Sequence, residues 1–298
     1  QNYTSDPANP LTGQVWFNST SSSLKVNAGA LVGAWATANS LNTSRFAAGA
    51  SGIQTAALAF AGGNPNVTVT ESYNGTNWTE VNDLNSARRY VAGFGTQTAA
   101  LCVGGFGAGQ AQTELWNGTN WTEVNDLTQG RYKSAGMGTT TAGLVAGGDG
   151  PTGKTELWNG TNWTEVNDLG TARYGLGGAG TQTAGLVFGG NPLTAITETW
   201  NGTNWTEVND LNTARYALAS AGTQTAALAF GGAAPPNSAL TETWNGTNWT
   251  EVNDMNTARA LLPGVGTNTL ALAIGGSPQQ ATVEEWSFSG GIQTIGTS

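Results

Sequence analysis

The sequence predicts an all-β fold, a six-bladed β-propeller whose blades each hold four antiparallel strands. The first observation is the string Asn-Gly-Thr-Asn-Trp-Thr-Glu-Val-Asn-Asp-Leu, which begins at Asn74, Asn117, Asn159 and Asn201, and at Asn245 with Met255 in the last place. Its tryptophan and one degenerate copy recur every 42 to 44 residues, at Trp35, Trp78, Trp121, Trp163, Trp205 and Trp249. A glycine doublet recurs in phase six times, from Gly62-Gly63 to Gly275-Gly276. Repeats of this length are typical of propeller blades.

Within one unit the apolar residues alternate with a period of two, as in strands. In the unit that begins at Thr171 we expect four strands, at Arg173–Ala179, Ala184–Phe188, Thr197–Trp200 and Trp205–Val208. Asn201-Gly202 is a hairpin turn signal between the last two strands. The small residues of the first strand suit the innermost position, where six strands converge on a narrow channel.

The two ends of the chain explain how such a ring closes. Residues 32–41, with Trp35, supply only a fourth strand, whereas the unit from Thr257 supplies three strands and ends near Phe288. Joined, they make one complete blade by a 3+1 strand closure, which leaves no open sheet edge. We therefore expect a propeller over residues 31–298 and a short N-terminal hairpin, an anchoring extension, over residues 1–30.

Four markers of the unit resemble the kelch repeat. These are the arginine before strand one, the glycine doublet after strand two, an aromatic residue in strand three and a tryptophan in strand four, as in Arg173, Gly189-Gly190, Trp200 and Trp205. The resemblance covers residues from about 33 to 288 and implies a kelch-like six-bladed propeller.

The N-terminal segment resembles a small module of bacteriophage tail and fibre proteins. The resemblance rests on Gly13-Gln14-Val15-Trp16-Phe17-Asn18 and on Leu24-Lys25, which form an expected hairpin of two short strands. Together with the repeats it is similar to virion-surface proteins of marine phages. It implies a non-catalytic virion structural or binding module, tail- or fibre-associated, on the virion surface or otherwise extracellular. The expected partners are other virion proteins, through this N-terminal segment, and a host-surface glycan or protein.

Composition excludes several functions. The chain has no histidine and one cysteine, so Ser-His-Asp triads, Cys-His dyads and paired-cysteine zinc sites are impossible. We expect a protein that is not an enzyme and that binds no cofactor or metal. The remaining enzymatic alternative is a glycosidase-like carboxylate pair. The non-catalytic alternative is a lectin-like or cell-surface adhesin propeller. A net charge of −9 disfavours nucleic acid. The apolar runs are too short for membrane insertion.

The repeated residues have structural interpretations that compete with functional ones. Six arginines, one per unit, could bind an anion at the channel, but pairing with a repeat carboxylate such as Glu198 or Asp210 is the favoured interpretation. Tryptophans at repeat positions suit blade packing better than sugar stacking, and Trp16 is the exception. We interpret Cys102 as an inert thiol of the core.

The segments that join strand two to strand three differ in every unit, and we call them the variable loops. They are residues 64–69, 106–112, 149–154, 191–196, 233–240 and 277–283. Variation on one rim of a rigid scaffold favours a binding surface, although drift after duplication is the alternative. The candidate binding residues on this rim are Asn64, Asn66, Phe106, Gln110, Asp149, Lys154, Asn191, Leu193, Pro235, Asn237, Gln279 and Gln280.

Overall fold

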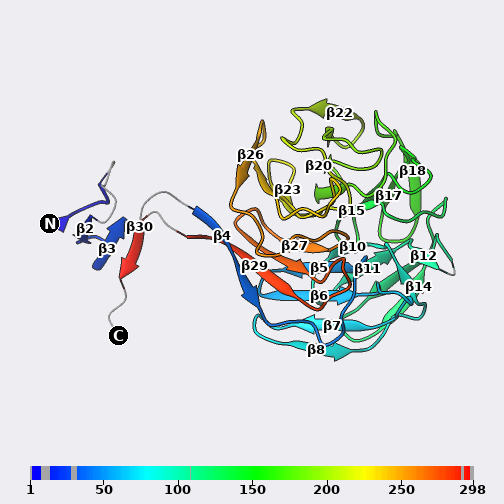
Figure 1. The fold of residues 1–298 in the computed structure, drawn as a ribbon, viewed down its shortest axis with the longest axis horizontal. Coiled ribbons are helices and arrows are strands. Elements are labelled where there is room, and N and C mark those ends of the chain that lie inside the picture. Colours follow the sequence, from blue (N-terminus) through cyan, green and yellow to red (C-terminus); the bar gives the residue numbers. More distant parts are fainter. Residues whose placement is uncertain (1, 8–13, 28–31, 108, 290–291, 296–298) are drawn as a thin grey trace. The chain divides into compact units, whose positions relative to one another are not determined.

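The structure, a computed structural model, describes residues 2–7, 14–27, 32–107, 109–289 and 292–295. Every regular element in these ranges is a β-strand (Figure 1). The described residues accordingly include no helix of the length and apolarity needed to cross a membrane. The chain is all-β, as the period-two pattern predicts.

Six four-stranded sheets repeat along the chain. Their strands, in order of pairing, are β5 (Gly49–Ile53), β6 (Ala56–Phe60), β7 (Thr70–Tyr73) and β8 (Trp78–Val81) in sheet 1; β10 (Ala92–Gly95), β11 (Ala100–Val103), β13 (Thr113–Trp116) and β14 (Trp121–Val124) in sheet 2; and β15 (Ala135–Gly138), β16 (Gly143–Ala146), β17 (Thr155–Trp158) and β18 (Trp163–Val166) in sheet 3. Sheet 4 holds β19 (Gly177–Gly180), β20 (Gly185–Phe188), β21 (Thr197–Trp200) and β22 (Trp205–Val208); sheet 5 holds β23 (Ala219–Thr223), β24 (Ala226–Phe230), β25 (Thr241–Trp244) and β26 (Trp249–Val252); and sheet 6 holds β27 (Gly264–Gly266), β28 (Leu270–Ile274), β29 (Val283–Ser289) and β4 (Val32–Ala38).

Sheets 1 to 5 are antiparallel throughout, and each repeats one register. In sheet 4, for example, Trp200 lies opposite Trp205 across the β21–β22 pair. Sheet 6 takes its outer strand, β4, from the N-terminal part of the chain and its other three strands from the C-terminal part. This composition agrees with the expected three-plus-one sheet.

The six sheets surround a common centre in a propeller-like arrangement (Figure 1). The innermost strands β5, β10, β15, β19, β23 and β27 contact one another in that order, and β27 contacts β5. A cyclic series of backbone hydrogen bonds, which we call the mouth ring, runs along the same path: each residue donates its N–H to the carbonyl of its counterpart in the preceding sheet. Its members are Ala47, Tyr90, Lys133, Gly175, Ala217 and Leu261, with N···O distances of 2.6 to 2.9 Å.

A second cyclic series connects the glycine doublets to the arginines. The second glycine of each doublet, or its equivalent, donates its N–H to the arginine carbonyl of the next sheet, as from Gly190 to Arg215 at 3.0 Å. The last of these bonds runs from Gly276 to Arg45, back to the first sheet. Both series therefore return to their starting point.

The expected start of the first strand is wrong, and the mouth ring explains why. We expected this strand to span Arg173–Ala179, but β19 begins at Gly177. The reason is that Gly175 has a φ of 63°, in the left-handed region that a strand cannot continue through. The other five mouth-ring residues share this conformation, with φ between 53° and 59°. The arginine accordingly lies in the segment that precedes the strand, except that Arg88 belongs to a short strand β9 (Arg88–Arg89), which pairs with β12 (Phe106–Gly107).

Apolar side chains fill the wedges between neighbouring sheets. Phe188 of sheet 4 meets Trp249 of sheet 5 at 4.7 Å between ring centroids, and both are buried. Tryptophans of the fourth strands also donate hydrogen bonds to threonines that begin third strands in the preceding sheet, as from Trp249 Nε1 to Thr197 Oγ1 at 3.1 Å. The glycines of the innermost strands have no room for a side chain: a Cβ on Gly136 would lie 2.8 Å from the ring of Phe94 in the neighbouring strand β10. This close approach explains the glycine content of these strands.

The chain divides into two compact units, Trp35–Trp286 and a smaller unit of Gln1–Ala34 with Ser287–Ser298. The smaller unit contains the sheet β1–β2–β3–β30, formed by β1 (Asn2–Tyr3), β2 (Val15–Asn18), β3 (Ser23–Asn27) and β30 (Ile292–Ile295). The antiparallel β2–β3 pair confirms the expected hairpin. The pairing of β30 with β3 was not anticipated, since the expected propeller extended to residue 298. Gly13 of the phage-like motif lies outside the described residues.

Candidate functional site

The repeated arginines are buried and paired. Arg215 is 0% exposed, and its Nη2 lies 2.8 Å from Oε1 of Glu242, itself 1% exposed. The same pair recurs in every sheet: Arg45–Glu71, Arg88–Glu114, Arg131–Glu156, Arg173–Glu198 and Arg259–Glu284. Burial lowers the pKa of the Arg215 guanidinium, and the Glu242 carboxylate opposes that shift. These arginines join strands within the fold, which confirms the structural interpretation.

The repeat aspartates and asparagines are also used within the fold. Asp210, a predicted arginine partner, instead accepts a hydrogen bond from the Thr197 N–H at 3.0 Å. Asn201 Oδ1 caps its own turn by accepting from the N–H groups of Thr203 and Asn204. Asn167 Nδ2 of the neighbouring sheet donates to Asn204 Oδ1 at 2.9 Å. Equivalent amide bridges connect the other Asn-Gly-Thr-Asn turns, which we call the repeated turns.

The single thiol and the tryptophans have the surroundings expected of core residues. Cys102 is fully buried in β11, and burial raises its pKa to about 11. Trp16 is 1% exposed, and its Nε1 donates to Asp6 at 3.0 Å in the smaller unit. No group of three or more His, Cys, Asp and Glu side chains placed to hold a metal ion occurs in the part of the chain that the structure describes.

The variable loops lie where the sequence places them, between the second and third strands, and neighbouring loops bind one another. Asn66 Nδ2 donates to the Phe106 carbonyl at 2.9 Å, and Gln279 Oε1 accepts from the Asn64 N–H at 3.2 Å. Asn237 Nδ2 donates to the Ser277 carbonyl at 2.7 Å. These contacts join candidate residues of sheets 1, 2, 5 and 6 along one rim.

The remaining candidate residues divide between exposed side chains and backbone contacts. Leu193 is 51% exposed, and Pro235 is exposed as well. Three others hold the rim through their backbones: Asn191 pairs with Tyr174, Gln280 with Arg45, and Gln110 accepts from Arg131.

The two charged candidates carry ion pairs. Lys154 Nζ lies 2.6 Å from Glu165 Oε1 and 3.6 Å from Asp168 Oδ2. Asp149 lies 3.5 Å from Lys133 Nζ. A hydrogen bond to Asp149, together with burial, raises the pKa of the Tyr132 hydroxyl to about 12.

Sequence reasoning missed a cluster of cations and aromatic rings on this rim, which we call the cation–aromatic patch. It comprises Arg89, Tyr90, Phe106, Tyr132, Lys133 and Tyr174. All but Phe106 occupy the one or two positions after a repeat arginine, where other units have residues such as Ala217 and Ala260. That irregularity among otherwise near-identical units was the available signal.

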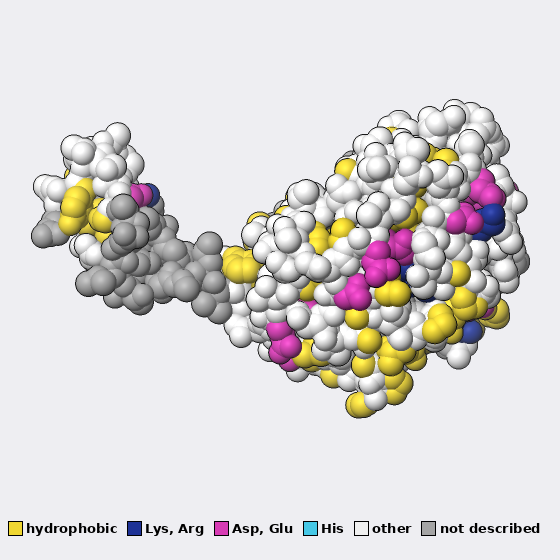
Figure 2. All heavy atoms as spheres, turned by 90° about the horizontal axis from the view of Figure 1, so that it is seen from above, with side chains coloured by type: hydrophobic (Ala, Val, Ile, Leu, Met, Phe, Trp, Pro, Cys, Tyr) yellow, Lys and Arg dark blue, Asp and Glu magenta, His cyan; other side chains and the backbone are white. Residues whose placement is uncertain are grey.

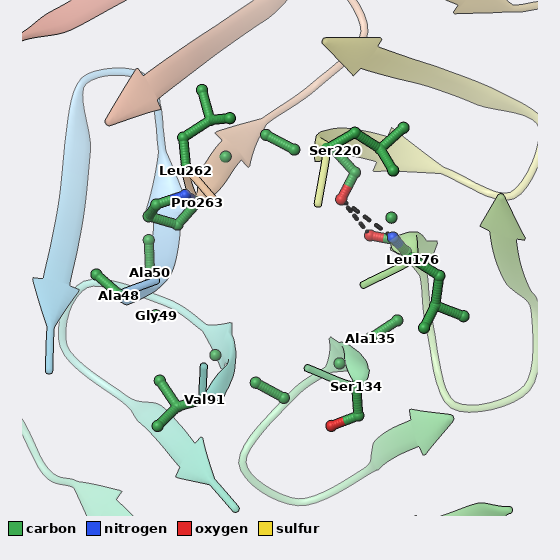
Figure 3. A pocket seen from close by; sticks show the side chains of 18 residues that line it. Ala48, Gly49, Ala50, Val91, Ser134, Ala135, Leu176, Ser220, Leu262 and Pro263 are labelled. Atoms are coloured by element: carbon green, nitrogen blue, oxygen red, sulfur yellow. Dashed lines mark hydrogen bonds between the residues drawn. The ribbon is translucent and has the colours of Figure 1, made fainter. Parts of the chain in front are cut away.

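The channel itself is narrow and lined by small residues. Its walls come from all six innermost strands and the segments before them, with Ala48, Val91, Ser134, Leu176 and Leu262 around one opening (Figure 3). Ser220 donates to the Gly178 carbonyl at 2.7 Å and accepts from the Gly178 N–H at 3.2 Å, so its hydroxyl is used between two strands. The channel wall therefore offers backbone groups, aliphatic side chains and the Ser134 hydroxyl, while charged groups lie on the rim.

No protein-family model matches the sequence, and no curated protein matches it.

Proposed function

We propose that this chain is a closed six-bladed, kelch-type propeller that serves as a non-catalytic binding module of a virion, associated with a phage tail or fibre. In this proposal the variable loops recognise a glycan or protein of the host surface. The N-terminal segment attaches the module to other virion proteins, and the module acts on the virion surface, outside the cell.

The observation that carries the proposal is a difference between the two ends of each sheet. The repeated turns use their amide groups on one another, as Asn167 does on Asn204. The variable loops enter the third strand at its other end and carry exposed side chains such as Phe106 and Leu193. A surface whose side chains are both diverse and free to contact solvent is suited to recognition, since binding residues concentrate on loops held by a rigid scaffold.

Two further features support the closed kelch-type ring and the absence of catalysis. Both cyclic hydrogen-bond series return to the first sheet, and the repeat arginine, glycine doublet and tryptophan each have a structural partner. Two of the three repeat carboxylates of a unit are used in the same way: Glu242 is held by Arg215, and Asp210 by the Thr197 N–H. The third, such as Glu251, is exposed.

The test exchanges one variable loop for another within the full chain. Residues 233–240 are replaced by residues 191–196, and binding to a glycan array and to candidate host cells is measured. The exchange is compatible with the scaffold, because Asn191 and Ala233 form the same backbone pair, with Tyr174 and Tyr216 respectively. We expect the melting temperature to be retained and the binding pattern to change.

The matched control is Thr203→Ser in a repeated turn, where the side chain is exposed and the backbone carbonyl still accepts from Asn167. It should leave binding unchanged. Silent loop exchanges combined with loss of attachment on changing the repeated turns would replace this proposal by a multivalent lectin that uses the repetitive end of the sheets.

A further inference from the structure

We infer that the cation–aromatic patch is a binding site for an acidic saccharide, that is, a sugar chain bearing carboxylate or sulfate groups. This inference rests on the proposed function and narrows it to one sector of the rim, in sheets 2 to 4.

The first argument is the distribution of positive charge. Of the 10 Lys and Arg residues in a chain of net charge −9, one per sheet is locked in a buried pair with glutamate, and Lys25 lies in the smaller unit. Lys154 is held by Glu165 and Asp168. Arg89 and Lys133 both belong to the patch: Arg89 has no carboxylate partner among the described ion pairs, and Lys133 has one distant partner, Asp149 at 3.5 Å. Figure 2 shows how few Lys and Arg atoms appear among the carboxylates on the face it presents. An anion that approaches this acidic protein is attracted to this sector and repelled elsewhere.

The second argument is geometry. Lys133 Nζ lies 4.9 Å from the Tyr90 ring centroid and 4.8 Å from that of Tyr174. Arg89 Cζ lies 5.1 Å from the Phe106 ring, and Phe106 lies 5.4 Å from Tyr132. The rings therefore form a connected cluster in which Arg89 contacts Phe106 and Tyr90, and Lys133 contacts Tyr90, Tyr132 and Tyr174. Cation–π contacts hold both side chains in place, which reduces the entropy lost when a ligand binds.

The third argument is the match with sugar chemistry. A pyranose ring presents C–H groups on one face, which pack on an aromatic ring, and hydroxyls at its edge, which need hydrogen-bond partners. Phe106, 40% exposed, offers such an aromatic face, while Tyr132 and Asp149 offer a hydroxyl and a carboxylate beside it. Lys133 and Arg89 supply charge-assisted hydrogen bonds for an acidic substituent. Extended polyanions such as nucleic acids fit less well, because the remainder of the protein is acidic.

Asymmetry of the mouth ring agrees with this assignment. Lys133 and Tyr90 line one side of the hollow at the channel mouth, whereas Ala47, Ala217 and Leu261 line the other. The equivalent positions thus have different side chains although their backbone conformations are alike. The patch is therefore confined to one part of a repeated backbone structure.

The experiment measures binding of the full chain to arrayed oligosaccharides of three kinds, uronate-containing, sulfated and neutral, followed by titration calorimetry with the tightest ligand. We expect acidic chains to bind about ten-fold or more tightly than neutral chains, with affinity falling as salt is raised. The uronate and sulfate arms identify which acidic group is preferred.

Two variants place the site. Lys133→Met and Arg89→Met should each weaken binding of the acidic ligand about ten-fold, because each removes a charge-assisted contact. Lys154→Met, which removes a cation of the same rim that contacts no ring of the patch and is held by Glu165 and Asp168, is the matched control and should leave affinity unchanged. Methionine retains the length of the side chain and the mouth-ring backbone bond of Lys133, and melting curves verify folding.

The outcomes separate this inference from the proposed function. Failure of the wild-type chain to bind any acidic saccharide, or binding that neither patch variant weakens, overturns the inference. If loop exchange still alters binding to another ligand in that case, the proposed function stands without it. If loop exchange is silent as well, both fail.

Discussion

Replacing Val283 by threonine should stabilise the contact between sheets 6 and 1. In the other contacts, a fourth-strand tryptophan donates a hydrogen bond to a threonine of the preceding sheet. These bonds run from Trp121 to Thr70, Trp163 to Thr113, Trp205 to Thr155, Trp249 to Thr197 and Trp35 to Thr241, at 3.0 to 3.1 Å. Between sheets 6 and 1 the threonine position holds Val283, and within the described residues the buried Trp78 Nε1 has no partner. One indole N–H is therefore desolvated without compensation.

The expected gain in stability comes from giving the Trp78 Nε1–H group a hydrogen-bond partner. A buried donor without a partner costs about 1–3 kcal/mol, and a formed intramolecular hydrogen bond contributes about 0.5–1.5 kcal/mol net. The added hydroxyl must also be satisfied. It can accept from Trp78 and donate to the carbonyl two residues earlier, as Thr197 Oγ1 does to Ala195 at 3.5 Å. We expect Val283→Thr to raise the free energy of unfolding by about 1 kcal/mol, or the melting temperature by roughly 2–4 °C.

The assay is equilibrium unfolding in urea, followed by tryptophan fluorescence. The reciprocal change Thr241→Val, which removes the partner of Trp35, should cost about 1–3 kcal/mol and is the matched control. Destabilisation by Val283→Thr alongside a neutral Thr241→Val would show that these indole bonds do not contribute to stability and would refute the reasoning.

Three more outcomes follow from the described contacts. Glu242→Gln leaves a buried arginine without its counter-charge and should lower the free energy of unfolding in urea by about 3–5 kcal/mol. The same change at the exposed Glu251 should alter it by no more than about 0.5 kcal/mol. Equal effects would contradict the role of the buried pair. Cys102, fully buried with its pKa raised to about 11, should react with a thiol reagent at pH 8 only as fast as the protein unfolds, and rapid labelling of the native protein would disprove this. The Tyr132 hydroxyl, with its pKa raised to about 12, favours its neutral form in the folded state, so its contribution to stability is present below pH 10 and lost between pH 10 and 12. The 295 nm absorbance that the parent shows and Tyr132→Phe lacks should titrate near pH 12, and in Asp149→Asn this transition should shift downward; a parent-minus-variant difference that titrates near pH 10 would contradict it.

Most of the sheet architecture follows from the sequence because each unit repeats the same local rules. Strands β21 and β22 match the expected bounds, since their alternation and the Asn201-Gly202 turn are both local signals. The start of β19 did not follow, because nothing in Arg-Tyr-Gly states that Gly175 adopts a positive φ to bind the neighbouring sheet. The pairing of β30 with β3 was equally inaccessible, because these segments stand outside the repeat and are far apart in the sequence.

For the candidate site, the sequence predicted which rim of the fold carries it but not which side chains form it. The variable loops could be recognised because they differ where the strands do not, and the structure places them between the second and third strands. Two bounds differ: β29 begins at Val283, inside the segment 277–283, and β12 occupies Phe106–Gly107. The cation–aromatic patch depends on side chains of sheets 2 to 4 that meet across sheet boundaries, such as Lys133 with Tyr90 and Tyr174. Such contacts depend on how neighbouring sheets pack side by side, which a single sequence does not encode locally.

The shared sheet formed by β4 and β29 has a consequence for how the protein is made. Strand β4 ends at Ala38, and its partner β29 begins at Val283. At typical synthesis rates the ribosome needs about 10–50 s to add the intervening residues. Throughout that time β4 has no partner strand, while the residues of sheets 1 to 5 are synthesised. The pairing of β4 with β29 is thus late relative to the synthesis of sheets 1 to 5, and a chain that stalls before β29 leaves β4 without its partner strand.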